Sequence, residues 1–176
     1  QEVLDNMSDV AHFAPTHGRK QVVYFENEYD GHTMVQYFGA GHRTLATESE
    51  LLELKTWYTG PAILTSRMWG HMPSIMMITH TPVDDGVIRA WHALMVKSPN
   101  AVATAEDVQT ARAYQETSRL AFAQDFEVWS NKRPAFNILQ IPADGPFHKG
   151  RVWYSQFYQP RARAKEIQGR VNGTHG

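Results

Sequence analysis

The chain has 176 residues, of which 42% are hydrophobic and 20% are charged, and this composition suits one folded domain and excludes a disordered chain. Its formal net charge is −1 and no basic stretch is dense enough to follow a phosphate backbone, so nucleic acid is not expected as a partner. It has no cysteine, which excludes disulfides, thiolate metal sites and a cysteine-ligated iron–sulfur cluster in this chain, and it has no apolar run long enough to span a membrane.

The first half of the chain predicts one helix followed by a sheet. Residues 2–13 have a helical pattern, and Pro15 is expected to end this helix because proline cannot continue the hydrogen-bond ladder. Apolar, β-branched or aromatic runs follow, separated by glycine, aspartate and proline residues typical of turns. These runs cover residues 20–30, 32–40, 51–60, 62–70, 73–83 and 86–97. We therefore expect an antiparallel meander of about six or seven strands.

A long helix is predicted after the strands. Residues 104–132 contain no glycine or proline and many good helix formers. Thr104 and Asp107 have the spacing of a capping box at its start, and Asn131 to Pro134 is expected to end it. Together the elements predict an α+β fold in which a curved antiparallel sheet wraps around this helix and leaves a cavity between the two.

The remaining residues predict a second helix and a tail. Residues 150–168 are rich in aromatic side chains and have a helical pattern that Pro160 interrupts. Residues 169–176 are expected to be a frayed tail.

The opening segment contains a candidate metal site. Asp9 and His12 lie three residues apart and would share one helix face. Pro15 bends the chain afterwards, which would let His17 turn back toward His12, so that two imidazoles could bind one metal. The His-x4-His spacing is a weak signal by itself, because ordinary surface and core histidines are common.

A carboxylate far along the chain could complete this site. Phe122, Asp125 and Trp129 are spaced i, i+3 and i+7 and form one stripe on the long helix. An ionised carboxylate between two aromatic side chains is costly to bury unless something compensates its charge, and a metal would do so. The alternative is that Asp125 is solvated, or pairs with Arg119 or Lys132.

Two histidines and one carboxylate are the ligands of a non-haem Fe(II) facial triad, which leaves positions open for dioxygen or water. Zinc accepts the same ligands, so the ligand types alone do not separate the two metals.

The segments NMSDVAHFAPTHG (residues 6–18) and DFEVW (residues 125–129) together resemble the catalytic domain of Rieske non-haem iron oxygenases. Within that family the chain is most similar to the oxygenase component of 3-ketosteroid 9α-hydroxylases. The resemblance extends from Asp5 to about Tyr158.

This resemblance implies a helix-grip (START-like) fold and a mononuclear Fe(II) bound by His12, His17 and Asp125. It implies that Asp9 contacts a ligand histidine and links the iron to a Rieske cluster, commonly that of a neighbouring subunit in a homotrimer. A carboxylate that accepts the ring N–H of His12 would fix its tautomer and raise its basicity. Asn6, one turn earlier, would support Asp9. For both Asp9 and Asn6, simple polarity of a helix surface remains the alternative.

The implied activity is that of a cytoplasmic monooxygenase, which hydroxylates a hydrophobic substrate, a steroid such as a 3-ketosteroid, with O2. Electrons would come from NAD(P)H through a partner reductase or ferredoxin and the Rieske cluster. The methionine-rich residues 66–80 would suit an adaptable apolar pocket, and His71 and His80 could lie near it. Ordinary core packing is the alternative for these residues.

The Rieske domain of this family precedes the catalytic domain and needs a Cys-x-His and Cys-x-x-His pair, which a chain without cysteine lacks. The chain also opens in helix-like sequence before its first methionine, Met7. We therefore expect residues 1–176 to be the mononuclear-iron catalytic domain, with the N-terminal Rieske [2Fe–2S] domain absent from this chain.

Two other functions remain open at this point. Helix-grip domains can carry a lipid or another hydrophobic ligand without a metal, so a non-catalytic binding domain is one alternative. A zinc hydrolase with the same three ligands is the other, although no His-Glu-x-x-His motif supplies a general base.

Overall fold

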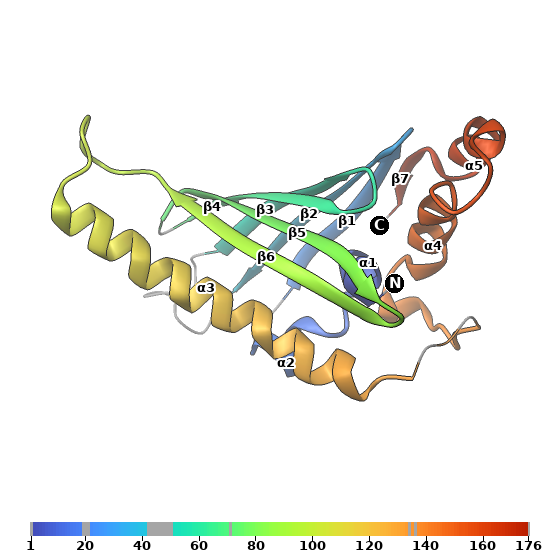
Figure 1. Ribbon diagram of the computed structural model, residues 1–176, viewed down its shortest axis with the longest axis horizontal. Coiled ribbons are helices and arrows are strands. Elements are labelled where there is room, and N and C mark those ends of the chain that lie inside the picture. Colours follow the sequence, from blue (N-terminus) through green and yellow to red (C-terminus); the bar gives the residue numbers. More distant parts are fainter. Residues whose placement is uncertain are drawn as a thin grey trace.

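The computed structural model describes residues 2–18, 22–41, 51–70, 72–133, 135 and 137–175. In this part of the chain, the strands form one antiparallel sheet in the order β6-β5-β4-β3-β2-β1-β7 (Figure 1). The strands are β1 (Val22–Asp30), β2 (Thr33–Gly41), β3 (Leu51–Thr59), β4 (Ile63–Trp69), β5 (Ser74–Asp84), β6 (Val87–Val96) and β7 (Gly173–His175). The meander and its six predicted runs are confirmed.

The long helix α3 (Ala105–Asn131) runs along the sheet beside β6, and this α+β arrangement agrees with the predicted helix-grip fold (Figure 1). The predicted capping box is present at its start. The backbone N–H of Asp107 donates to Thr104 Oγ1 at 3.2 Å, and the N–H of Thr104 donates to Asp107 Oδ2 at 2.9 Å. The helix ends at Asn131 as expected, and Pro134 lies outside the described residues.

The C-terminal segment packs at the end of the sheet that carries β1 and β7. It contains α4 (Phe147–Ser155) and α5 (Ala164–Val171), with the short 3-10 turns η2 (Pro142–Asp144) and η3 (Arg161–Arg163). The predicted interruption at Pro160 is confirmed. The prediction of a frayed tail over residues 169–176 is wrong, because Val171 is a buried helical residue and β7 pairs with β1, Gly173 opposite Tyr29.

The opening segment differs from the single helix predicted over residues 2–13. It consists of α1 (Glu2–Asp5), η1 (Asn6–Ser8) and, after an extended residue at Asp9, α2 (Phe13–His17). The backbone groups that would continue the first helix form hydrogen bonds with other parts of the fold instead. The Met7 carbonyl accepts the side-chain amides of Asn27 and Gln36, both at 2.9 Å, and the Val10 N–H donates to the Asp144 carbonyl at 3.0 Å.

The sequence predicted that Pro15 ends a helix, and this prediction is wrong. Pro15 lies inside α2 as its third residue. The first N–H groups of a helix have no partner within the helix, so proline costs little there. The helix ends at His17, and the next residue, the C-cap Gly18, has a left-handed φ of 63°.

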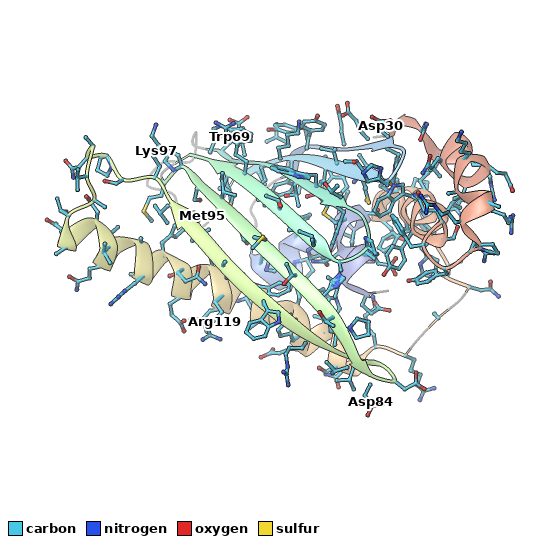
Figure 2. The ribbon with its side chains drawn as sticks, turned by 45° about the horizontal axis from the view of Figure 1, so that its top comes forward. Asp30, Trp69, Asp84, Met95, Lys97 and Arg119 are labelled. Atoms are coloured by element: carbon cyan, nitrogen blue, oxygen red, sulfur yellow. The ribbon has the colours of Figure 1, made fainter. Side chains whose placement is uncertain are left out.

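The strands alternate between a buried and an exposed face, as residues of a one-sided sheet do. Side chains on the inner face include Met34, Tyr58 and Ile78, which belong to the hydrophobic core. The outer face is open to solvent on β6, where Trp91 and Met95 are exposed, and Figure 2 shows Met95 on this face and Asp84 at the tip of the β5–β6 hairpin.

The tight turn between β1 and β2 connects the sheet to the C-terminal helices. Gly31 has a φ of 55°, and its carbonyl accepts the indole N–H of Trp153 at 3.1 Å and the amide of Gln156 at 3.3 Å. Trp153 is fully buried, so α4 is held firmly against this turn. Among the described residues, no helix has the length and apolar character needed to cross a membrane.

Candidate metal centre

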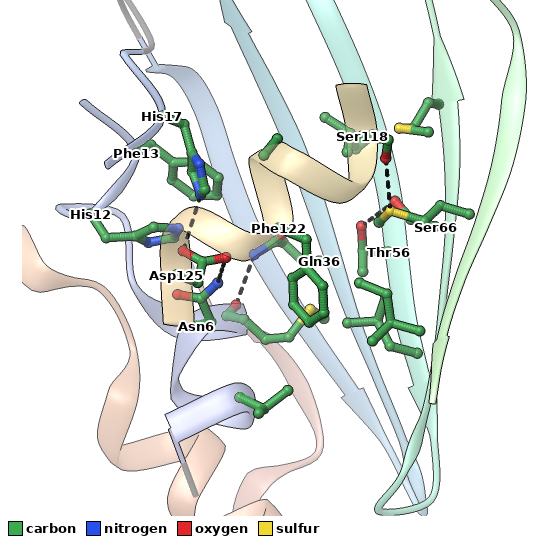
Figure 3. A pocket seen from close by; sticks show the side chains of 18 of the residues that line it. Asn6, His12, Phe13, His17, Gln36, Thr56, Ser66, Ser118, Phe122 and Asp125 are labelled. Carbon is green, nitrogen blue, oxygen red and sulfur yellow. Dashed lines mark hydrogen bonds and ion pairs between the residues drawn. The ribbon is translucent and has the colours of Figure 1, made fainter. Parts of the chain in front are cut away.

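Three segments bring His12, His17 and Asp125 together. His12 precedes α2, His17 is the last residue of α2, and Asp125 lies on α3. One ligand atom from each side chain lies within 4.8 Å of the other two, and the two imidazole centroids are 5.2 Å apart. Figure 3 shows the three side chains pointing toward one another. The predicted convergence in space is therefore present, while metal binding itself stays a prediction.

His12 is held in one tautomer by its own turn. Its Nδ1–H donates to the backbone carbonyl of Asp9 at 2.8 Å, which leaves the lone pair on Nε2. Nε2 is buried and has no hydrogen-bond partner in the described part of the chain. A buried polar atom of this kind is uncommon in folded proteins, and a cation beside Nε2 would account for it.

His17 is oriented in the same way by a different kind of partner. Its Nδ1 contacts Gln124 Oε1 at 3.2 Å, so that Nε2 faces Asp125, with 3.3 Å between Nε2 and Oδ1. Sequence reasoning missed Gln124. The only available signal was its place next to Asp125, and a helix neighbour of a ligand does not by itself predict a contact with a histidine of another segment.

Asp125 is the only residue of α3 that is buried, with 4% of its surface exposed. The alternative of a solvated carboxylate is therefore wrong. The alternative that Asp125 pairs with Arg119 or Lys132 is wrong as well. Arg119 pairs with Glu116 at 2.5 Å, and Lys132 pairs with Glu2.

Asp9 contacts the candidate ligand His12, as predicted, but not through the ring N–H that its carboxylate was expected to accept, and Asn6 has a different partner from the one predicted. The carboxylate of Asp9 accepts the backbone N–H of His12 at 3.1 Å, and its Oδ2 is 3.7 Å from Nδ1, so the ring N–H goes to the Asp9 carbonyl and not to its carboxylate. Asn6 does not contact the Asp9 side chain through its amide. It donates to Asp125 Oδ2 at 3.4 Å instead.

The donor set suits a divalent cation. The Nδ1 contacts of the two imidazoles leave their Nε2 atoms for a metal, and Asp125 adds a carboxylate in a buried position. A cation held by these three side chains would keep further coordination positions for other ligands, as in mononuclear iron sites, and zinc would accept the same donors.

The three side chains lie in the wall of a cavity of about 180 Å³ between the sheet and α3 (Figure 3). Phe122 and Trp129 line it together with Asp125, which confirms the predicted stripe. The remaining walls are mostly apolar and include Leu54, Leu64, Met68, Met76 and Ile78.

Only part of the predicted methionine-rich pocket lines this cavity. Met68 and Met76 do, but Met77 points outward. His80 is buried with its ring 6.0 Å from that of Tyr58. It does not itself line the cavity, but it lies two residues after Ile78, which does, on the same face of β5. His71 lies outside the described residues.

The amino-acid sequence of this chain is similar to those of known proteins. The family described as "3-Ketosteroid 9alpha-hydroxylase C-terminal domain" matches residues 1–158. Two proteins of Rhodococcus rhodochrous are similar over 90% of this chain. They are "Probable 3-ketosteroid-9-alpha-monooxygenase, oxygenase component", with 31% identity, and "3-ketosteroid-9-alpha-monooxygenase, oxygenase component", with 29%. The chain spans 43% of the length of each. "Cholesterol 7-desaturase" of Caenorhabditis elegans is 38% identical over 26% of this chain and 10% of its own length.

Proposed function

Because the chain belongs to the 3-ketosteroid 9α-hydroxylase C-terminal domain family, we propose that it is the mononuclear-iron catalytic domain of a Rieske-type steroid monooxygenase. The observation that carries this proposal is the convergence of His12, His17 and Asp125 at the wall of an apolar cavity. The proposed substrate is a hydrophobic steroid, in keeping with the apolar lining and with the names of the two Rhodococcus relatives.

The residues of this chain would have distinct tasks in the reaction. His12, His17 and Asp125 would hold Fe(II), which when bound supplies the activation of O2 for insertion of one oxygen atom into a substrate C–H bond. The Asp9 carbonyl and Gln124 keep the two imidazoles in the ligating tautomer. The apolar walls would bind the substrate, exclude water and leave the open side of the metal site for O2.

The electron supply would come from outside this chain. A chain without cysteine cannot ligate a Rieske [2Fe–2S] cluster, so we propose that the cluster is on another domain and receives electrons from NAD(P)H through a reductase or ferredoxin partner. The Asp9 carboxylate is 23% exposed and lies beside His12, which supports its proposed role as the link toward that cluster. The homotrimer and the cytoplasmic location stay predictions.

Iron reconstitution tests the ligand assignment. Purified chain loaded anaerobically with Fe(II) and then desalted is expected to retain about one iron per chain. The His12→Ala and Asp125→Ala variants are expected to lose it, as measured by elemental analysis. His148→Ala and Asp85→Ala remove the same side-chain types at exposed positions and serve as matched controls. Wild-type iron content in both His12→Ala and Asp125→Ala would show that the assignment is wrong.

A non-catalytic binding domain remains the second candidate, because the cavity walls are mostly apolar with or without a metal. Metal-stripped protein separates the two functions. A binding domain would bind steroid equally well with and without iron and would show no specific iron retention. If the protein retained zinc in preference to iron, this would favour a zinc site with the same three ligands.

A further inference from the structure

A row of polar side chains crosses the inner face of the sheet. Gln36, Thr56 and Ser66 are cross-strand partners on β2, β3 and β4, and Met76 on β5 continues the row. All four line the cavity. The amide of Gln36 already donates to the Met7 carbonyl and so has a structural task. In the part of the chain that the structure describes, neither Thr56 nor Ser66 makes a comparable side-chain hydrogen bond to the backbone of a neighbouring element.

The two hydroxyls pair with each other at the buried wall. Thr56 Oγ1 and Ser66 Oγ are 2.7 Å apart, and Ser66 is fully buried. Each hydroxyl carries one proton, and their mutual hydrogen bond uses only one of the two. No other hydrogen bond of either hydroxyl occurs within the described ranges. The second proton is therefore available to an acceptor inside the cavity, and leaving it unused in an apolar wall is unfavourable.

A third hydroxyl approaches the cavity from α3. The amide of Gln115 donates to His92 Nδ1 at 3.0 Å, so the His92 ring carries its proton on Nε2 and donates it to Ser118 Oγ at 3.1 Å. Burial, with the Arg119 charge nearby, lowers the pKa of His92 and favours this neutral form. Among the described residues, the proton of Ser118 has only the Met76 sulfur as acceptor, at 3.7 Å, and a thioether is a weak acceptor.

These hydroxyls lie well away from the candidate metal centre. Ser118 and Asp125 both line the cavity and are seven residues apart on α3, which corresponds to roughly 10 Å along the helix. Figure 3 shows Thr56, Ser66 and Ser118 on one side of the cavity and His12, His17 and Asp125 on the other, with Phe122 between them.

We propose that Thr56, Ser66 and Ser118 form an oxygen anchor, which binds one carbonyl or hydroxyl oxygen of an otherwise hydrophobic substrate. The anchor rests on the proposed function in one respect, since it takes the cavity as the substrate site. Its donors face an oxygen at one end of the cavity while the apolar walls hold the carbon skeleton. The separation between this end of the cavity and the candidate metal centre, of which Ser118 and Asp125 are roughly 10 Å apart along α3, then selects which carbon of the substrate reaches the metal.

Two probes that differ only in oxygen test the anchor. Androstanedione and the hydrocarbon androstane share one ring skeleton, and their binding to the iron-loaded chain is measured by quenching of tryptophan fluorescence, to which Trp129 in the cavity wall contributes. Ser66→Ala, Thr56→Val and Ser118→Ala are each expected to weaken androstanedione binding by about 5- to 10-fold. Androstane binding is expected to stay unchanged. Thr65→Val removes a hydroxyl from the opposite face of β4 and serves as the control.

The outcomes separate the anchor from the proposed function. Equal androstanedione affinity in wild type and all three variants overturns the anchor, and so does an equal loss for both probes or no binding of androstanedione to wild type. Ser118→Ala, on α3, keeps the test valid if a strand variant melts at a lower temperature than wild type. Iron content is measured on the same samples. An oxygen-dependent loss of affinity in protein that retains no iron supports the anchor and removes the iron assignment.

Discussion

At the scale of single residues, the candidate centre depends on how each imidazole is held. His12 donates its Nδ1–H to a backbone carbonyl within its own turn, whereas His17 relies on the side chain of Gln124 from another element. Both arrangements leave Nε2 as the donor atom for a metal. A backbone carbonyl cannot be removed by substitution, but a glutamine side chain can, so the two histidines differ in how easily they can be perturbed.

Gln124→Leu is therefore expected to weaken iron binding without removing it. Loss of the contact with Nδ1 frees the tautomer and orientation of His17, and removal of such an outer partner typically lowers metal affinity about 10- to 100-fold. The measurement is competition with a chelator of known affinity. Gln109→Leu, at an exposed position of the same helix, provides the control. Unchanged affinity in Gln124→Leu would contradict the role assigned to this glutamine.

At the scale of elements, the start of α3 is organised by one carboxylate. Asp107 accepts hydrogen bonds from Ser98 Oγ at 3.0 Å, Asn100 Nδ2 at 2.9 Å and the Thr104 N–H at 2.9 Å. These donors hold the pKa of Asp107 down at about 2. Because Asp125 and Ser118 lie on the same helix, this cap also contributes to holding the cavity wall in place.

Asp107→Ala is expected to lower the thermal unfolding midpoint at neutral pH, and the difference from wild type should shrink in acid. The pKa of this carboxyl is lower in the folded than in the unfolded chain. Its stabilisation is therefore fully present above the unfolded pKa of about 3.8 and is lost as the pH falls toward 2. Circular dichroism melting curves between pH 7 and pH 2 measure this. If the difference in unfolding midpoint between wild type and Asp107→Ala were independent of pH, the charge of Asp107 would not contribute to stability.

At the scale of the whole molecule, the C-terminal helices hold the segment that carries the two histidines. Arg151 on α4 donates to both oxygens of the buried Asp5, at 3.1 and 2.6 Å. Together with the contacts of Met7 and Val10 described above, this ion pair fixes α1 and η1 between the sheet and α4. The candidate metal centre thus depends on contacts between the N-terminal segment and α4.

Arg151→Met is expected to lower the free energy of unfolding by about 3 kcal/mol, because a buried carboxylate loses two charge-assisted hydrogen bonds. Urea unfolding followed by circular dichroism measures the change. Arg163→Met removes an arginine of similar chemistry from the exposed pair with Glu166 and should have little effect. The double variant Asp5→Leu, Arg151→Met should recover part of the stability, and a single variant as stable as wild type would contradict the role of this pair.

The elements that sequence reasoning predicted well are those whose pattern is local. The six long strands and α3 follow from alternation, turn residues and a capping box, all of which lie within a few residues of one another. The three residues of the candidate site, His12, His17 and Asp125, could also be named in advance, since they belong to two short motifs. The opening helix was predicted wrongly because Met7 and Val10 bond to residues of β1, β2 and η2, which no local pattern reveals.

The sequence by itself determined the order of strands and helices, the ligand types of the candidate site and the aromatic stripe around Asp125, because periodicity and chemical identity are properties of neighbouring residues. Only the tertiary structure decided that Gln124 orients His17, that β7 pairs with β1, and that Thr56, Ser66 and Ser118 share one cavity. These are contacts between groups brought together by sheet register and by the packing of α3, and register is set by the burial of a whole face and not by any one segment.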